Sequence, residues 1–257
     1  IIGTLGSKQI KIKPVYLVSR VSSGINFYNN FNYNFIRILS IYLFSTLLVI
    51  FLYTLTNIRL FDSFNLAFTT ISSGGFLPTE NLSSIISNNL QNFVLSLTLL
   101  LPIFNFFLFF KILTRQTSII NHKEDLHLLF MIILISMIFY FLVIPNEKFL
   151  VVLISILSSI SSSGISVYAS EFDTSLFFIL LTLVGGSVVS VSSGFKYIRF
   201  YILLKVSYQE IYRLVKPINI FNKNLFNTES KFSDADTKIA FLVFISFIIS
   251  IFILSSI

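Results

Sequence analysis

The chain has 257 residues, of which 55% are hydrophobic and only 11% are charged, and its mean hydropathy is +0.88. Ordinary globular domains carry about 25% charged residues, and a chain of this size has too small an interior to hide so much apolar surface from water. These values exclude a soluble protein and predict an all-α membrane protein that crosses the bilayer several times. The absence of cysteine excludes disulfides, thiolate zinc sites and cysteine nucleophiles.

Five apolar runs approach the roughly 20 residues that a helix needs to cross a bilayer. Two further apolar runs, 61–71 and 149–160, are too short to cross, and each ends in a Ser/Gly cluster. We interpret each of the two as a re-entrant half-helix followed by a loop. The expected spans, in chain order, are Phe35–Thr56, Leu90–Ile112, Leu126–Ile144, Leu176–Leu204 and Ile239–Ile257.

The net charge of +7 is distributed unevenly along the chain. With these spans, all but two of the 18 Lys and Arg residues fall on one side of the membrane, and the exceptions are Arg59 and Lys148. The positive-inside rule makes the basic side cytoplasmic. The opposite side carries Glu80, Glu171 and Asp173, whose field would attract cations. The charge bias therefore indicates topology, and we expect no nucleic-acid partner.

The chain repeats itself at an offset of 89 residues, which aligns 69–76 (TTISSGGF) with 158–165 (SSISSSGI). The apolar runs before and after each cluster also superpose. The pattern predicts two copies of one unit: span, short helix, loop and span. The run from Ile239 would open a third copy.

The two Ser/Gly loops, 72–76 and 161–165, are candidates for an ion site. Backbone that leaves helical geometry at membrane depth is tolerated only where it is buried in protein or lines water. Glycine at position 75 or 164 can adopt a positive φ and turn carbonyls toward one axis, where a ring of carbonyls can replace the hydration shell of a cation. The C-terminal end of each half-helix would add partial negative charge. The predicted filter residues are Ser72, Ser73, Gly74, Gly75, Ser162, Ser163 and Gly164.

The alternative is that these clusters are helix-packing contacts or ordinary exterior turns.

The expected span Leu176–Leu204 is too long for a straight crossing. At 1.5 Å per residue it would extend roughly 43 Å, against about 30 Å of hydrocarbon. We expect its small residues to interrupt the helix and to form a mobile gate, with Lys196 and Arg199 just on the cytoplasmic side. A close helix crossing is the alternative. The predicted gate residues are Gly185, Gly186, Ser187, Ser192, Ser193 and Gly194.

Catalysis finds little support in the sequence. His122 and His127 lie with Glu124 and Asp125 in the short charged connection, and no further ligand or nucleophile is spaced to join them, so we expect a solvated cytoplasmic loop. Asp234 and Asp236 precede the last span, where acidic residues favour a helix N-terminus. No P-loop, GxGxxG or HExxH pattern is present. We expect neither an enzyme nor a bound cofactor or metal.

Several motifs together resemble the membrane subunit of the Trk/Ktr/HKT potassium uptake superfamily. They are 64–76 (FNLAFTTISSGGF), the loop 161–164 (SSSG), the stretch 185–200 (GGSVVSVSSGFKYIRF) and the basic segment from Lys205 to Pro217. The resemblance implies four helix–pore loop–helix repeats around one potassium pathway. Gly75 would be the filter glycine of the second repeat, Gly164 that of the third, and 185–194 the intramembrane gate loop.

The same resemblance implies a multi-pass protein of the cell (inner) membrane, with potassium as the transported ion. It further implies a homodimer and a cytosolic nucleotide-binding regulatory subunit. The sequence departs from the family pattern at Val188, Val189 and Val191, where small residues are usual, and at Ile165, where Phe is common.

The resulting organisation has six parts. They are a cytoplasmic segment 1–34, a second-repeat-like unit 35–112, a cytoplasmic connection 113–125, a third-repeat-like unit with a broken second helix 126–205, a cytoplasmic basic segment 206–238, and the first helix of a further repeat 239–257. Because the chain starts Ile1-Ile2 and stops in an apolar run, we expect a piece of a longer protein that lacks the first and last pore loops.

Two other functions remain open at this stage. Broken helices and internal repeats also build secondary transporters, for example of sodium, although their repeats are commonly inverted. Here both copies have the same orientation and no ionisable residue sits in the middle of a span, which favours a pore. A non-conducting scaffold or gene fragment is the second alternative, and span–loop units encoded on both sides would argue against it.

The charge distribution generates a topology test. Because the chain has no cysteine, single cysteines at positions 80 and 223 would be the only thiols in it. Membrane-impermeant thiol reagents should label Glu80→Cys from outside and Lys223→Cys from the cytoplasm. Labelling of both from the same side would contradict the predicted topology.

Overall fold

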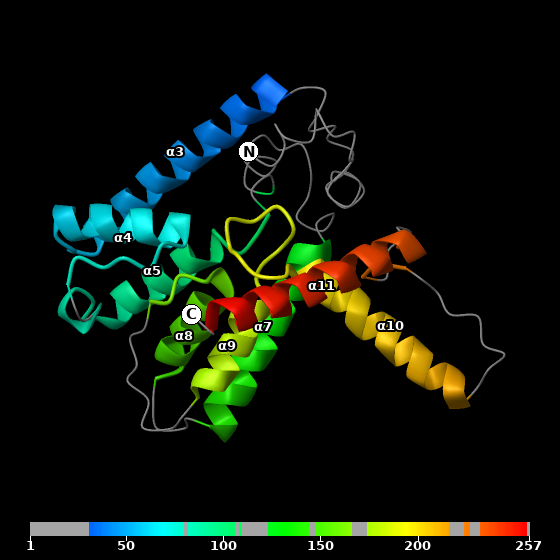
Figure 1. Cartoon of the computed structure of the whole chain (residues 1–257). Helices are drawn as coiled ribbons and strands as arrows, with labels where there is room; N and C mark the ends of the chain where they lie inside the picture. Colours follow the sequence, from blue (N-terminus) through cyan, green and yellow to red (C-terminus); the bar gives the residue numbers. More distant parts are fainter. Residues whose placement is uncertain are drawn as a thin grey trace. The chain divides into compact units, whose positions relative to one another are not determined.

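The computed structural model describes residues 31–79, 82–105, 108, 123–143, 148–165, 174–215, 224–226 and 232–255. Within these ranges the regular elements are helices, as predicted for an all-α membrane protein. The chain divides into two units, residues 41–201 and residues 1–40 with 202–257. The candidate site lies in the first unit, which is drawn from blue to yellow in Figure 1. Glu80, His122, Glu171, Asp173 and most of the expected cytoplasmic segments lie outside the described residues.

Helices that are long and apolar enough to cross a membrane confirm the membrane class. The three in the described part of the chain are the 38–55 stretch of α3 (Phe31–Leu55), α7 (Lys123–Leu142) and α11 (Asp234–Ser255). Large apolar side chains lie exposed along them, such as Phe51, Phe130 and Phe252. Such side chains suit contact with lipid, where they do not oppose folding as they would in water.

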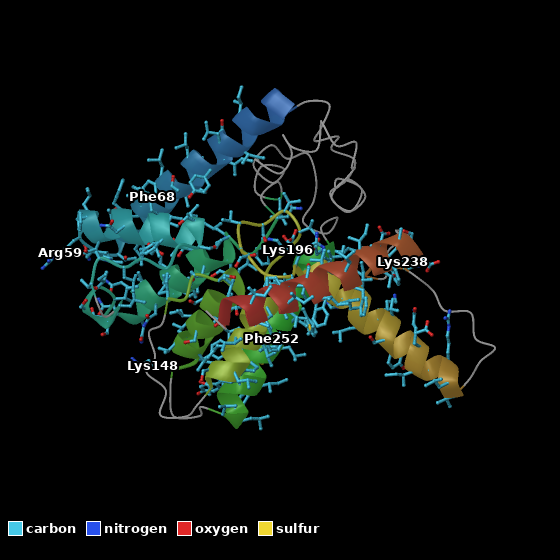
Figure 2. The ribbon with its side chains drawn as sticks, viewed as in Figure 1. Arg59, Phe68, Lys148, Lys196, Lys238 and Phe252 are labelled. Atoms are coloured by element: carbon cyan, nitrogen blue, oxygen red, sulfur yellow. The ribbon has the colours of Figure 1, made fainter. Side chains whose placement is uncertain are left out.

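The repeat seen in the sequence is also a structural repeat. Helices α4 (Leu60–Ser72) and α8 (Phe149–Ser161) both have 13 residues, and their first and last residues are related by the same offset of 89. The residue before each helix is basic, Arg59 or Lys148, and both are labelled in Figure 2. The two exceptions to the charge bias therefore occupy equivalent positions.

Helix α8 forms the centre of this unit. It packs against α5 (Asn89–Leu100), α7 and α9 (Ser175–Val184), which surround it in Figure 1. Most of its side chains are buried, with Ile154 and Ile156 fully so. Helix α4 packs on α5 and buries only one face, while Phe68 on the other face is exposed. A short 3₁₀ helix, Leu82–Ser84, lies between α4 and α5.

The second expected span, Leu90–Ile112, is not one continuous helix. Helix α5 ends at Leu100, and the N–H of Leu101 bonds to the Thr98 carbonyl at 3.1 Å in a tightened last turn. Pro102 explains the end, because it has no N–H to continue the ladder and its ring crowds the preceding turn. The prediction of an unbroken helix is therefore wrong at residues 101–105.

The expected span Leu176–Leu204 is divided in two. Helix α9 ends at Val184 and α10 (Tyr197–Val215) begins after a non-helical stretch at 185–196. Helix α10 also continues beyond the expected end of the span, to Val215. The break lies at the small residues that the sequence analysis identified.

Helix α11 begins as its acidic residues predict. Asp234 is its first residue, and the Asp236 carboxylate accepts the backbone N–H of Ser233 at 2.7 Å. The Ser233 hydroxyl in turn accepts the N–H of Asp236 at 3.3 Å. These reciprocal bonds form a capping box that satisfies donors at the helix start.

The central position of α8 generates a stability prediction. Leu157 is 1% exposed, so Leu157→Ala should leave a cavity and lower the free energy of unfolding by about 2–5 kcal/mol. Leu176→Ala on α9, where the side chain is 70% exposed, should cost much less and is the matched control. Thermal unfolding of both variants in detergent tests the difference. Equal losses would show that α8 is not the packing centre.

Candidate functional site

The first loop folds back over the C-terminus of α4. Ser73 adopts a left-handed conformation with φ of 55°, its N–H bonds to Thr70 O at 3.4 Å, and the N–H of Gly74 bonds to Thr69 O at 3.0 Å. These are the bonds of a Schellman-type helix end. The Thr69 hydroxyl also donates to the carbonyl of Phe76, which closes the loop onto the last turn of the helix.

The second loop repeats this construction at equivalent positions. Ser162 has φ of 61°, and the N–H groups of Ser162 and Ser163 each bond at 3.0 Å, to the carbonyls of Ser159 and Ser158. The side-chain hydrogen bonds that stabilise the second loop differ from those of the first loop. The Ser163 hydroxyl lies 3.2 Å from that of Ser158 and 3.0 Å from that of Ser161, so a cluster of buried serines replaces the single threonine bond.

Each loop contains one glycine with a positive φ, Gly75 at 75° and Gly164 at 67°. Side chains other than glycine rarely adopt this region, because Cβ crowds the following carbonyl. A Cβ on Gly75 would overlap the backbone carbonyl oxygen of Ser163, whereas a Cβ on Gly164 would meet no described atom within 4 Å. The two predicted filter loops are therefore in contact, although 89 residues separate their equivalent positions.

Ser73 and Ser162 share a further property. Each side-chain oxygen is buried, and no hydrogen-bond partner for it is found among the described residues. A buried hydroxyl without a partner loses its hydration and costs free energy, so such groups normally meet water or a bound species. The same unpaired oxygen at equivalent positions of two adjoining loops indicates a shared polar site.

The electrostatics of the two loops favour a cation. Helices α4 and α8 end at the loops, and the unpaired carbonyls of a helix C-terminus carry partial negative charge. The loops offer only backbone groups and serine hydroxyls, and the stretches 72–76 and 161–165 hold no Lys or Arg. Neutral oxygens of this kind can replace the hydration shell of a cation.

We call the non-helical stretch 185–196 the broken segment; it is drawn in yellow between α9 and α10 in Figure 1. The carbonyls beyond the end of α5 anchor it, because the N–H of Ser187 bonds to Ile103 O at 2.9 Å and that of Ser192 to Pro102 O at 3.1 Å. Its two ends are also joined, since the N–H of Tyr197 bonds to the carbonyl of Gly186 at 2.9 Å. The stretch is therefore an ordered loop with its own network of bonds.

Lys196 and Arg199 fold back onto the broken segment. The Lys196 ammonium donates to the carbonyl and hydroxyl of Ser190 at 3.2 and 3.1 Å and to the carbonyl of Ser192. Arg199 donates to the carbonyl of Phe195 at 3.3 Å. Figure 2 shows Lys196 at this loop. The side chain of Lys196 thus satisfies carbonyls that left helical geometry, a role that its position after the glycines did not predict.

Glu124 and Asp125 are two site residues that the sequence analysis missed. They are 7% and 4% exposed, so the prediction of a solvated connection is wrong for them. The Glu124 carboxyl accepts the N–H of Val188 at 3.1 Å, and that of Asp125 accepts the N–H of Asn105 at 3.1 Å. No local signal in the sequence indicated this burial, because Lys123 adjoins the pair and both backbone donors lie on other segments of the chain.

His127 is also partly buried. Its Nδ1 lies 2.5 Å from the Tyr197 hydroxyl, and its ring packs edge-on against Tyr201. The first turns of α7 therefore contact the broken segment near its start and the beginning of α10.

Comparisons with known proteins agree with this architecture. No known family model matches the chain. An uncharacterized cation transporter of Methanocaldococcus jannaschii is 26% identical over 184 residues, which cover 70% of this chain and 38% of the relative. The crystal structure of the potassium transporter TrkH from Vibrio parahaemolyticus superposes with a TM-score of 0.70 and 18% identity, over 94% of this chain and 53% of TrkH. This chain thus spans about half the length of TrkH, or less than half of the archaeal relative. The chain therefore has the fold of the helical membrane transporter TrkH, as the sequence resemblance implied.

Proposed function

We propose that this chain forms part of a potassium uptake pore, with the two loops contributing to the ion-selectivity filter and the broken segment acting as its gate. The observation that carries the proposal is the repetition of one loop geometry at two adjoining places, each with a glycine at positive φ and a buried unpaired hydroxyl. The fold of TrkH, a potassium transporter, and the cation transporter relative support the same function.

The filter hypothesis follows from what a permeating cation needs. A potassium ion must exchange water oxygens for protein oxygens at little net cost, and it must also leave again. Neutral carbonyl and hydroxyl oxygens provide this exchange, whereas a carboxylate would hold the ion too strongly to release it quickly. The ends of α4 and α8 add a diffuse negative potential at the same place.

The gate hypothesis follows from the position and chemistry of the broken segment. Its carbonyls already accept one cation, the ammonium of Lys196. Its anchors on Pro102 and Ile103 are single backbone bonds, which a moderate rearrangement could exchange for water. The positive charges of Lys196 and Arg199 would oppose the passage of a free cation while the segment keeps this conformation.

The properties of the whole protein belong to the same proposal. They are uptake across the cell membrane with the basic segments in the cytoplasm, assembly as a homodimer, and control by a cytosolic nucleotide-binding subunit. They rest on the resemblance to the superfamily and on the charge bias.

Ion flux through the full-length protein tests the proposed activity. Expressed in cells that lack other potassium uptake systems, the protein should restore growth at low potassium and accumulate a potassium tracer. A sodium excess should compete weakly. Uptake of sodium with no preference for potassium would contradict the filter hypothesis, and no flux of either ion from a folded protein would contradict the pore.

The contact between the loops predicts unequal effects of the two filter glycines. Gly75→Ala combines a left-handed strain of about 1–2 kcal/mol with overlap on the Ser163 carbonyl. It should reduce potassium uptake by more than about tenfold or abolish the preference over sodium. Gly164→Ala introduces only the left-handed strain, so it should reduce potassium uptake less than Gly75→Ala does. Tracer uptake normalised to the amount of protein in the membrane measures both, and equal losses would argue against the contact as the cause.

The gate hypothesis predicts a gain of function. Deleting residues 188–191 from the full-length protein should raise potassium flux, because the segment could no longer obstruct the pathway, and should leave the potassium-to-sodium preference unchanged. Flux from proteoliposomes is the measurement, with the unfolding temperature as the control for folding. An unchanged flux in a stable deletion variant would show that the segment is not the gate.

A further inference from the structure

The buried carboxyl group of Glu124 meets the broken segment at one point. Its Oε1 accepts the backbone N–H of Val188 at 3.1 Å, from a side chain that is 7% exposed. Val188 is the fourth residue of the backbone that belongs to neither α9 nor α10. Glu124 is therefore a side chain from another helix that bonds directly to the main chain of this segment.

The two groups depend on each other. A backbone N–H away from water needs an acceptor, because an unpaired one costs about 1–3 kcal/mol. A buried carboxyl group likewise needs donors. Displacing the segment would leave both groups unpaired at once, so the bond stabilises the observed conformation more than an exposed bond would.

Lys196, the last residue of the broken segment, also restrains it. Its ammonium donates to the carbonyls of Ser190 and Ser192, and it interacts electrostatically with Glu124. Glu124 thus holds a donor and Lys196 holds acceptors within the same five residues, 188–192. His127 adds a bond to Tyr197 directly after the segment.

We propose that Glu124 is the positioning residue of the broken segment: by accepting the Val188 N–H it holds the segment in the conformation seen, while Lys196 binds the carbonyls of Ser190 and Ser192. That this conformation obstructs ions rests on the proposed function. Among the described residues no hydrogen bond joins Glu124 to a filter residue, so its effect on flux would act through the segment.

Two conservative variants separate the length of the side chain from its carboxyl group. Glu124→Gln keeps the length and an acceptor oxygen at the same place but removes the ionisable group, so it should preserve the bond to Val188. Glu124→Asp keeps the carboxyl group but is one methylene shorter, so it should lose the bond. Glu210→Asp on α10 is the matched control, because Glu210 is an exposed carboxylate that pairs with Arg213 at 2.7 Å.

The readout that reports position is the reactivity of a single thiol. In full-length protein whose only thiol is Val189→Cys, with any cysteine outside these 257 cysteine-free residues replaced by serine, a soluble thiol reagent added from the cytoplasmic side measures the exposure of the segment. Glu124→Asp should raise the modification rate at least severalfold and raise potassium flux. Glu124→Gln and Glu210→Asp should change neither. Unfolding temperatures of all variants identify any that fail to fold.

The outcomes distinguish this proposal from the gate. Faster modification of the thiol at position 189 in Glu124→Asp, with unchanged potassium flux, would support the positioning role of Glu124 and overturn the hypothesis that the segment is the gate. Unchanged modification in a folded Glu124→Asp would overturn the positioning role whatever the flux. Faster modification in Glu124→Gln, equal to that in Glu124→Asp, would show that the hydrogen bond does not hold the segment. If Glu124→Asp does not fold, Lys196→Met gives the same test from the acceptor side.

Discussion

Backbone polar groups that leave helical geometry inside a membrane must find partners within the protein, and this requirement organises the whole candidate site. The two loops and the broken segment satisfy this requirement with different partners. The two loops use helix-end bonds and hydroxyl groups. The broken segment uses the carbonyls of Pro102 and Ile103, the carboxyl of Glu124 and the ammonium of Lys196. The residues that supply partners are therefore as much part of the site as the loops themselves.

The two loops show how much of a local conformation is encoded locally. Their dihedral angles and helix-end bonds agree at equivalent positions, although the side chains behind them differ: Thr69 supports one and a serine cluster the other. A helix of fixed length, a small residue that tolerates the left-handed region and a glycine two positions later are sufficient for the turn. Neighbouring elements then decide what the turn contacts.

The difference between local conformation and long-range contacts also explains what could be predicted from the sequence. Half-helices, glycines with positive φ and the break at 185–196 follow from length and composition within one segment. To predict the early end of α5, the helix-breaking effect of Pro102 had to be given more weight than the long apolar run that contains it. The burial of Glu124 could not be predicted, because its partner Val188 lies 64 positions away and charged residues at a helix start are usually solvated. The contact of Gly75 with Ser163 is equally long-range.

The contact of Gly75 also constrains how this sequence can evolve. The atom that a side chain at 75 would strike is a main-chain oxygen, which no substitution at 163 removes. A mutation at 75 therefore has no simple compensating mutation, and glycine should persist there whatever the second loop contains. A Cβ at position 164 meets none of the described atoms, so the constraint seen there is a dihedral preference, which asparagine can partly satisfy. Homologous chains should accordingly vary at the second glycine before they vary at the first.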